Sequence, residues 1–99
     1  MRFTYKNGKL SQVRGITRLK STSKNIGNVS VFYGLYEIEL DNRRVFAVSV
    51  ADDDVFRLST GEKSSEIFEL YQLVSENEVD TVSFDGVVDD FMYSSNNIL

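Results

Sequence analysis

The segment Val29–Leu40 constrains the fold more than any other part of the chain, because β-branched and aromatic residues fill most of it. This composition predicts one long β-strand. One face of the strand is apolar and consists of the even positions Phe32, Gly34, Tyr36, Ile38 and Leu40. The other face is apolar at Val31, Tyr33 and Leu35 and becomes acidic at Glu37 and Glu39.

The next strand is predicted at 44–50, and the loop before it decides which side chains share a face. A two-residue loop would place Phe46 beside Glu37, whereas a three-residue loop pairs Ile38 with Phe46. Because the second register keeps apolar side chains together, we expect the three-residue loop Asp41–Arg43. The acidic turn Asp52–Asp54 then leads into a short strand at 55–58.

The N-terminal segment begins with a strong hairpin signal, Asn7-Gly8, because both residues tolerate the positive φ of a tight turn. A loop made of these two residues would place Tyr5 opposite Leu10. Residues 11–20 are predicted to form a strand with a bulge at Gly15. The polar residues 21–28 are predicted to form a loop.

Two helices are predicted in the C-terminal part. The pattern Ser59-Thr60-Gly61-Glu62 is typical of a capping box, so we expect a helix over residues 60–76. Asn77 should stop this helix, and Val79 should fold back onto its last turn. Ser83 should cap a shorter helix that runs to about Tyr93, before a frayed tail at 94–99. The apolar stripe of the first helix consists of Ile67, Leu70, Tyr71 and Val74.

These elements predict one α+β domain over residues 1–99. Its antiparallel β-meander has about four to five strands and is followed by two helices that cover one face of the sheet. The parts are a basic hairpin segment at 1–28, the sheet at 29–58, the helical part at 59–93 and the tail at 94–99. Since the chain shows neither a membrane span nor the apolar region of a signal peptide, we expect a cytoplasmic protein.

Four segments carry a family resemblance that extends over roughly two thirds of the chain: 33–39, Ser59-Thr60, 76–82 and 87–91. They resemble a family of small bacterial proteins that contain a domain of unknown function, mainly from spore-forming anaerobic Gram-positive bacteria. The resemblance implies a bacterial cytoplasmic protein with this fold, and it implies no activity. Two features depart from the family, which usually has proline at the position of Thr81 and a less basic N-terminal part.

The composition excludes several kinds of chemistry, because these 99 residues contain no Cys, His, Pro or Trp. Disulfides, zinc sites built from Cys or His, and triads that need an imidazole are therefore excluded. Asp52–Asp54 offers carboxylates to Mg²⁺ or Ca²⁺, but three consecutive side chains in a turn do not all converge, so a solvated turn is favoured. We expect no enzyme activity, no catalytic residue, no metal and no cofactor.

The charge is divided sharply along the chain. Residues 1–28 carry seven basic side chains and no acidic one, whereas residues 29–99 carry four basic and all fifteen acidic side chains. Three interpretations stay open: neutralisation within one domain, head-to-tail association of copies, and an anionic partner such as nucleic acid. The candidate residues for a polyanion are Arg2, Lys6, Lys9, Arg14 and Arg18.

A protein interface is the function that the sequence favours. If the helices cover the even face of the sheet, a contiguous apolar patch is left on the opposite face, and such a patch indicates a partner or a second copy. The patch would be buried instead if the N-terminal hairpin folded over it or if the helices were divided between both faces. We therefore expect a non-catalytic interaction or self-associating module, with polyanion binding through the basic segment as the alternative. The candidate interaction residues are Val31, Tyr33, Leu35, Val45 and Ala47.

Overall fold

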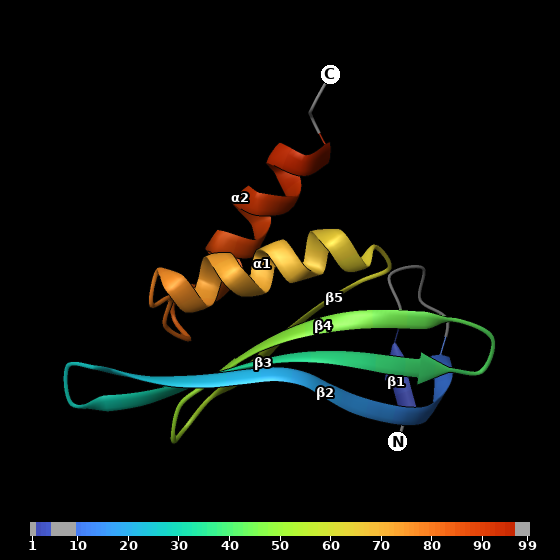
Figure 1. The fold of residues 1–99 in the computed structure, drawn as a ribbon, viewed down its shortest axis with the longest axis horizontal. Coiled ribbons are helices and arrows are strands. Elements are labelled where there is room, and N and C mark those ends of the chain that lie inside the picture. The colour runs from blue at the N-terminus through green and yellow to red at the C-terminus, as the bar shows by residue number, and fades with distance from the viewer. Residues whose placement is uncertain (1, 5–9, 97–99) are drawn as a thin grey trace.

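A computed structural model describes residues 2–4 and 10–96 of the chain, with side chains described over residues 13–93. Five antiparallel strands form one sheet in the order β1-β2-β3-β4-β5, and helices α1 (Ser64–Glu76) and α2 (Phe84–Asn96) lie on one side of it (Figure 1). The expected α+β meander with two C-terminal helices is confirmed. The strands are β1 (Arg2–Thr4), β2 (Leu10–Ile26), β3 (Val29–Leu40), β4 (Arg44–Ala51) and β5 (Phe56–Gly61).

The hairpin of β2 and β3 is the longest part of the sheet and extends beyond the other strands (Figure 1). β3 has the bounds that its composition predicts. The loop expected at 21–28 is wrong, because β2 continues to Ile26, which pairs with Val29. Gly27 opens the two-residue turn with a φ of 63°, a conformation that favours glycine. The polar residues fit a strand because Asn25 and Ser30 hydrogen-bond through their side chains across the hairpin at 3.0 Å.

The pairing of β2 with β3 shifts at two places, between Val13 and Gly15 and between Arg18 and Lys20. The first shift is the bulge that Gly15 predicts. From Lys20 to Ile26 the pairing is regular. At the other end of β2, Leu10 pairs with Thr4, so the expected pairing of Leu10 with Tyr5 is wrong. The predicted Asn7-Gly8 turn lies outside the described residues.

The register between β3 and β4 also differs from the expectation by one residue. Ile38 pairs with Val45 and Glu37 with Phe46, as a two-residue loop requires, so the three-residue loop is wrong. Phe46 tolerates an acidic neighbour because its ring turns to α1 and packs edge-to-face against Phe68, with ring centroids 5.8 Å apart. A tertiary contact therefore overrides the local pairing preference.

The main core lies between the sheet and α1, on the odd face of β3. The helices therefore do not cover the even face, which is the arrangement that the predicted apolar patch requires. The even face is a poorer helix platform because Gly34 on β3 has Ser21 and Ser49 as its cross-strand neighbours. The odd face presents larger apolar side chains, and the buried cluster contains Val31, Tyr33, Leu35, Val48, Val50, Ile67, Leu70, Val74, Val79 and Phe84.

Helix α1 begins later than the sequence predicts. Ser59, Thr60 and Gly61 continue β5 and pair with β4, so the expected capping box is wrong. Gly61 permits the close approach of α1 at this point, because a Cβ atom there would lie 2.8 Å from the Cδ1 atom of Ile67. The helix instead starts after Lys63, whose side chain makes no capping hydrogen bond.

The end of α1 matches the prediction more closely. The helix stops at Asn77, and the Val79 N–H donates to the Val74 carbonyl at 3.0 Å, which closes the last turn. The left-handed residue is Glu78, with a φ of 53°, and not Asn77. Val79 packs into the core, as expected.

The linker between the helices is fastened to the sheet by a buried hydrogen bond. The Tyr33 hydroxyl of β3 donates to the Val79 carbonyl at 2.8 Å. Burial raises the pKa of Tyr33, and the nearby carboxylates of Glu78 and Asp80 raise it further. The linker is thus held at a fixed place over β3.

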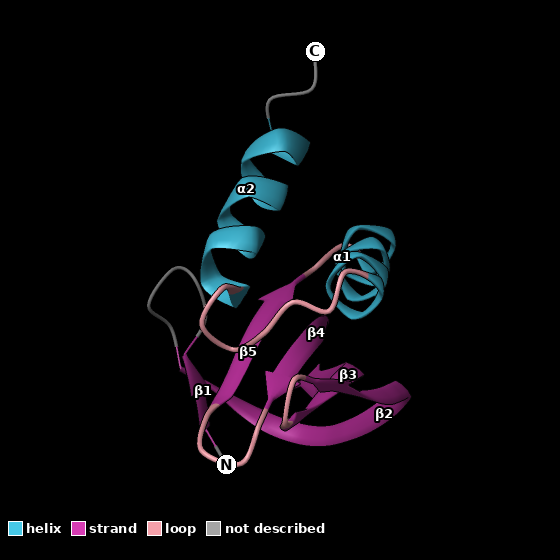
Figure 2. Ribbon diagram, turned by 90° about the vertical axis from the view of Figure 1, so that its left-hand side faces the viewer, coloured by secondary structure: helices cyan, strands magenta, loops and turns pink. Residues whose placement is uncertain are grey.

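Helix α2 begins after Ser83, as expected, and points away from the sheet (Figure 2). Its first residue, Phe84, is fully buried in the main core. The helix continues to Asn96, so the tail expected from residue 94 is wrong over residues 94–96.

Candidate interaction surfaces

The apolar patch predicted as an interface is part of the protein interior. All five of its residues are at most 2% exposed, so the prediction that they form a surface is wrong. Val31, Tyr33 and Leu35 lie on the face of the sheet that α1 covers. Val45 and Ala47 lie on the opposite face, because of the register shift, and form a second buried cluster with Ile38 and Leu40.

The residues predicted to bind a polyanion divide into three groups. Arg14 and Arg18 are exposed on β2. Arg2 lies on β1, and its side chain is outside the described part. Lys6 and Lys9 lie outside the described residues altogether.

Most arginines in the described part of the chain are ion-paired. Arg14 Nε lies 2.8 Å from Asp41 Oδ1, and Arg43, Arg44 and Arg57 each lie within 4.0 Å of a carboxylate. By contrast, Arg18, Lys20 and Lys24 make no ion pair with any described residue. All three lie on β2, so the basic segment is only partly neutralised within the domain. Lys20 and Lys24 belong to the basic segment but are not among the candidate residues predicted from the sequence.

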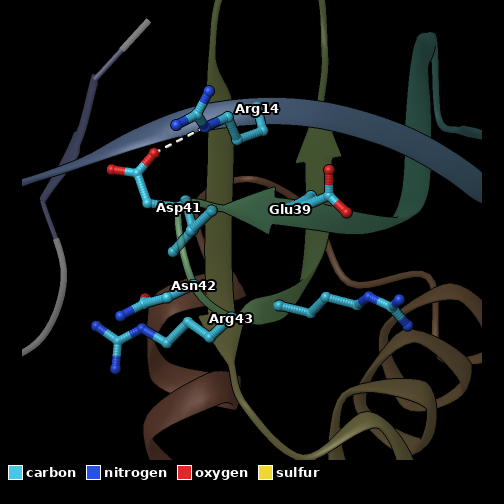
Figure 3. Close-up of a pocket in the computed structure, with 7 residues that line it drawn as sticks. Arg14, Glu39, Asp41, Asn42 and Arg43 are labelled. Atoms are coloured by element: carbon cyan, nitrogen blue, oxygen red, sulfur yellow. Dashed lines mark hydrogen bonds and ion pairs between the residues drawn. The ribbon is translucent and has the colours of Figure 1, made fainter.

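A depression of about 650 Å³ surrounds the β3–β4 turn (Figure 3). Arg14 reaches over from β2 to Asp41, whereas Glu39 points to the opposite side from Arg43 and Asn42 (Figure 3). The charged groups therefore diverge or neutralise each other. This arrangement does not converge on a ligand, so the depression is a poor binding site.

Asp52 is a structural carboxylate. Its Oδ1 accepts the backbone N–H groups of Asp54 at 2.9 Å and Val55 at 2.8 Å, which closes the β4–β5 turn. Its Oδ2 accepts the Thr81 hydroxyl at 2.9 Å and so ties this turn to the helix linker. The Asp54 N–H is the largest cause that lowers the pKa of Asp52, followed by the Thr81 hydroxyl and the Val55 N–H. Within the described ranges, no three acidic side chains are grouped to hold a metal ion.

The lowered pKa of Asp52 predicts a loss of stability in acid. The ionised carboxylate contributes stability above its ordinary pKa, and this contribution is lost as the pH falls through the lower pKa of the folded state. We expect Asp52→Asn to lower Tm at neutral pH, and the Tm difference from wild type to shrink as the pH falls from neutral into the acid range below the ordinary aspartate pKa. Thermal melts over this range test the prediction.

Asp53→Asn is the matched control, because Asp53 is exposed in the same turn and makes no hydrogen bond or ion pair with a described residue. Its Tm should stay close to that of the wild type at neutral pH. A constant Tm difference for Asp52→Asn across the whole pH range would contradict the ionised role of Asp52.

Comparison of the chain with protein-family models, with curated proteins and with solved structures gives no match. The family resemblance of the 33–39 and 76–91 region therefore stays a prediction. Among the described residues, neither helix has the length and apolar character needed to cross a membrane.

Proposed function

We propose that this protein is a non-catalytic interaction module that binds an extended, acidic segment of a partner protein along the free edge of β2. One observation carries the proposal. From Lys20 to Ile26, β2 pairs regularly with β3 on one side, and no described strand pairs with it on the other. We call this stretch the β2 edge.

The β2 edge offers unpaired backbone groups to a partner. β1 pairs with β2 only from Leu10 to Gln12, so the outward N–H and C=O groups farther along lack a strand partner in the described part. An added strand satisfies such groups by β-augmentation, in which the backbone supplies affinity and alternate side chains supply specificity. The two irregularities before Lys20 bend the earlier part of β2, which leaves 20–26 as the regular docking stretch.

The side chains of the β2 edge determine the charge of the partner. Lys20 pairs with Leu35 and Lys24 with Val31, so both lysines lie on the α1 side of the sheet with Thr22 between them. A strand added beside them would place every second side chain on that same side. Carboxylates four positions apart in the partner would then face the two lysines, neither of which has an ion pair among the described residues.

A second copy of this chain is a poorer partner for this edge. Two β2 edges paired antiparallel about Thr22 would bring Lys20 of one copy opposite Lys24 of the other, and like charges in this position are destabilising. The free edge of β5 contains no acidic residue. Residues 64–96 carry eight acidic side chains and no basic one, but α1 and α2 occupy most of this segment and a helix cannot add to a strand edge.

Binding to a synthetic peptide of alternating Glu and Thr tests the proposal. We expect the double variant Lys20→Glu, Lys24→Glu to weaken binding by about tenfold or more, because two attractions become repulsions. Lys63→Glu is the matched control, since Lys63 is exposed like Lys20 but lies at the start of α1. Its affinity for the peptide should equal that of the wild type.

Proline substitution at Thr22 and at Ser23 distinguishes strand addition from simple charge attraction. Neighbouring residues of a strand direct their N–H groups to opposite edges, so one proline breaks the β3 pairing and the other removes an outward donor. The proline variant that keeps the β3 pairing should fold, and it should lose peptide binding because it lacks an outward N–H donor. If it keeps full affinity, or if single-stranded oligothymidylate binds more tightly than the peptide, the β2 edge serves a polyanion and the proposal is wrong.

A further inference from the structure

The open face of the sheet, on the side away from α1, holds two exposed aromatic side chains separated by a small one. Phe32 of β3 pairs with Ala51 of β4, which pairs with Phe56 of β5, so the three lie in one row across the sheet. Phe32 is 51% exposed and Phe56 is 62% exposed. Because neighbouring strands are about 4.8 Å apart, the two phenylalanine backbones stand about 9.6 Å apart.

The next row of the open face has small residues on β2, β3 and β4. Gly34 lies between Ser21 and Ser49, its partners on the neighbouring strands. The Tyr36 side chain folds over Gly34, since a Cβ atom there would lie only 2.5 Å from the Tyr36 hydroxyl oxygen. The Ser49 hydroxyl donates to that oxygen at 3.4 Å. The hollow that we call the open-face hollow has a volume of about 410 Å³ and a polar floor, and its lining includes Ser21, Tyr36, Ser49 and the two phenylalanines.

The charge of the open-face hollow comes from one residue. Arg18 pairs with Tyr36 across β2 and β3 and is the one charged side chain among the described residues that line the hollow. It makes no ion pair in the described part of the chain. A guanidinium without a carboxylate partner in the lining of a hollow that also holds aromatic side chains is suited to an anionic group of a ligand.

We infer that the open-face hollow binds a planar aromatic group that carries an anionic substituent. The ligand ring lies over Ala51, between the rings of Phe32 and Phe56. A ring stacked with its centroid about 4.5–5 Å from the centroid of each phenylalanine fills the space between them. Its polar edge meets the hydroxyls of Ser49 and Tyr36, and the anion meets Arg18. The hollow shares Ser21, Thr22 and Ser23 with the β2 edge, but its ligand lies on the face of the sheet and not along the strand backbone, so separate probes test the two proposals.

Adenosine monophosphate and indole-3-propionate are the probes, because they combine a planar ring with a phosphate or a carboxylate. Adenosine and indole are their uncharged counterparts. We expect each anionic probe to bind about tenfold or more tightly than its counterpart, and the ring to shift the amide resonances of Ser49 and Ala51. The tighter of the two anions identifies the ligand as a nucleotide or an aromatic carboxylate, and either result supports the site.

Four variants decide between the site and nonspecific binding. Arg18→Gln should abolish the advantage of the anionic probes, and Phe56→Ala should weaken both probes by about tenfold. Ala51→Phe should fill the slot and abolish binding while the fold is kept, because Ala51 is half-buried at the end of β4. Ile16→Ala, at an exposed apolar position of β2 outside the hollow, is the control and should leave both affinities unchanged.

The inference is overturned if the anionic probes bind no more tightly than the uncharged ones, or if Ala51→Phe leaves binding intact. Neither result affects the β2 edge, because the Glu-Thr peptide and the lysine variants are measured separately.

Discussion

Replacing Leu35 with aspartate is expected to unfold the protein. Leu35 is 1% exposed and packs in the main core under α1. Loss of the leucine packing lowers the free energy of unfolding by about 2–5 kcal/mol. A buried carboxylate without a partner lowers it further. Because a domain has a total stability of about 5–15 kcal/mol, Leu35→Asp should show no cooperative thermal transition. Circular dichroism during heating measures this directly.

Phe32→Asp is the matched control, since Phe32 lies on the same strand, points to the opposite face and is 51% exposed. It should stay folded, with a melting curve close to that of the wild type. If Phe32→Asp unfolds the protein and Leu35→Asp does not, the helices cover the even face of β3. The pair of variants therefore tests which face of β3 carries the helical layer.

The sequence predicts β3 residue by residue but not the face that the helices cover. Strong alternation and β-branched residues are local properties, and they define the strand wherever it packs. Both faces of its first half are apolar, so the choice depends on neighbours that are distant in sequence. The structure places Gly34 among serines on one face and Leu35 beside Val48 on the other. Only the second face gives α1 a continuous apolar surface.

The candidate site on β2 could not be found from local composition. Ser, Thr, Lys and Asn dominate residues 21–25, and such residues favour loops when nothing pairs with them. Pairing with β3 extends the hairpin across this stretch and makes these polar residues part of a regular strand. The sequence therefore indicates a basic segment, while the pairing shows that Lys20 and Lys24 share one face of an edge.

The start of α1 illustrates a conflict between two local signals. Ser59 and Glu62 have the spacing of a capping box, yet Ser59 pairs with Val48 in the sheet. Extending β5 to Gly61 adds backbone hydrogen bonds, and the lack of a side chain at Gly61 leaves room for Ile67. Sheet pairing and helix packing together outweigh one cap, which is a modest contribution of about 1 kcal/mol.

Replacing Phe84 with alanine is expected to be the most destabilising of the simple truncations in α2. Phe84 is fully buried at the first position of the helix, whereas the helix beyond it points away from the sheet (Figure 2). Val87, Val88, Phe91 and Met92 of α2 also pack against the core, but they are only partly buried, so Phe84 is the fully buried anchor of the helix. Removal of a buried phenyl ring costs about 3–5 kcal/mol, which lowers Tm by at least about 12 °C in a domain of this size.

Val82→Ala is the control for Phe84→Ala, because Val82 lies two residues earlier and is 87% exposed. Its effect on the free energy of unfolding should stay within about 0.5 kcal/mol.

Hydrogen exchange shows how the loss of stability in Phe84→Ala is distributed along the chain. The main contacts of α2 are with α1 and β5. The amides of α2 should therefore lose their protection from exchange before those of β3 and β4 do. Equal loss of amide protection in all elements would show that α2 unfolds only together with the sheet. If Phe84→Ala has a Tm as high as that of Val82→Ala, the ring of Phe84 does not anchor the helix.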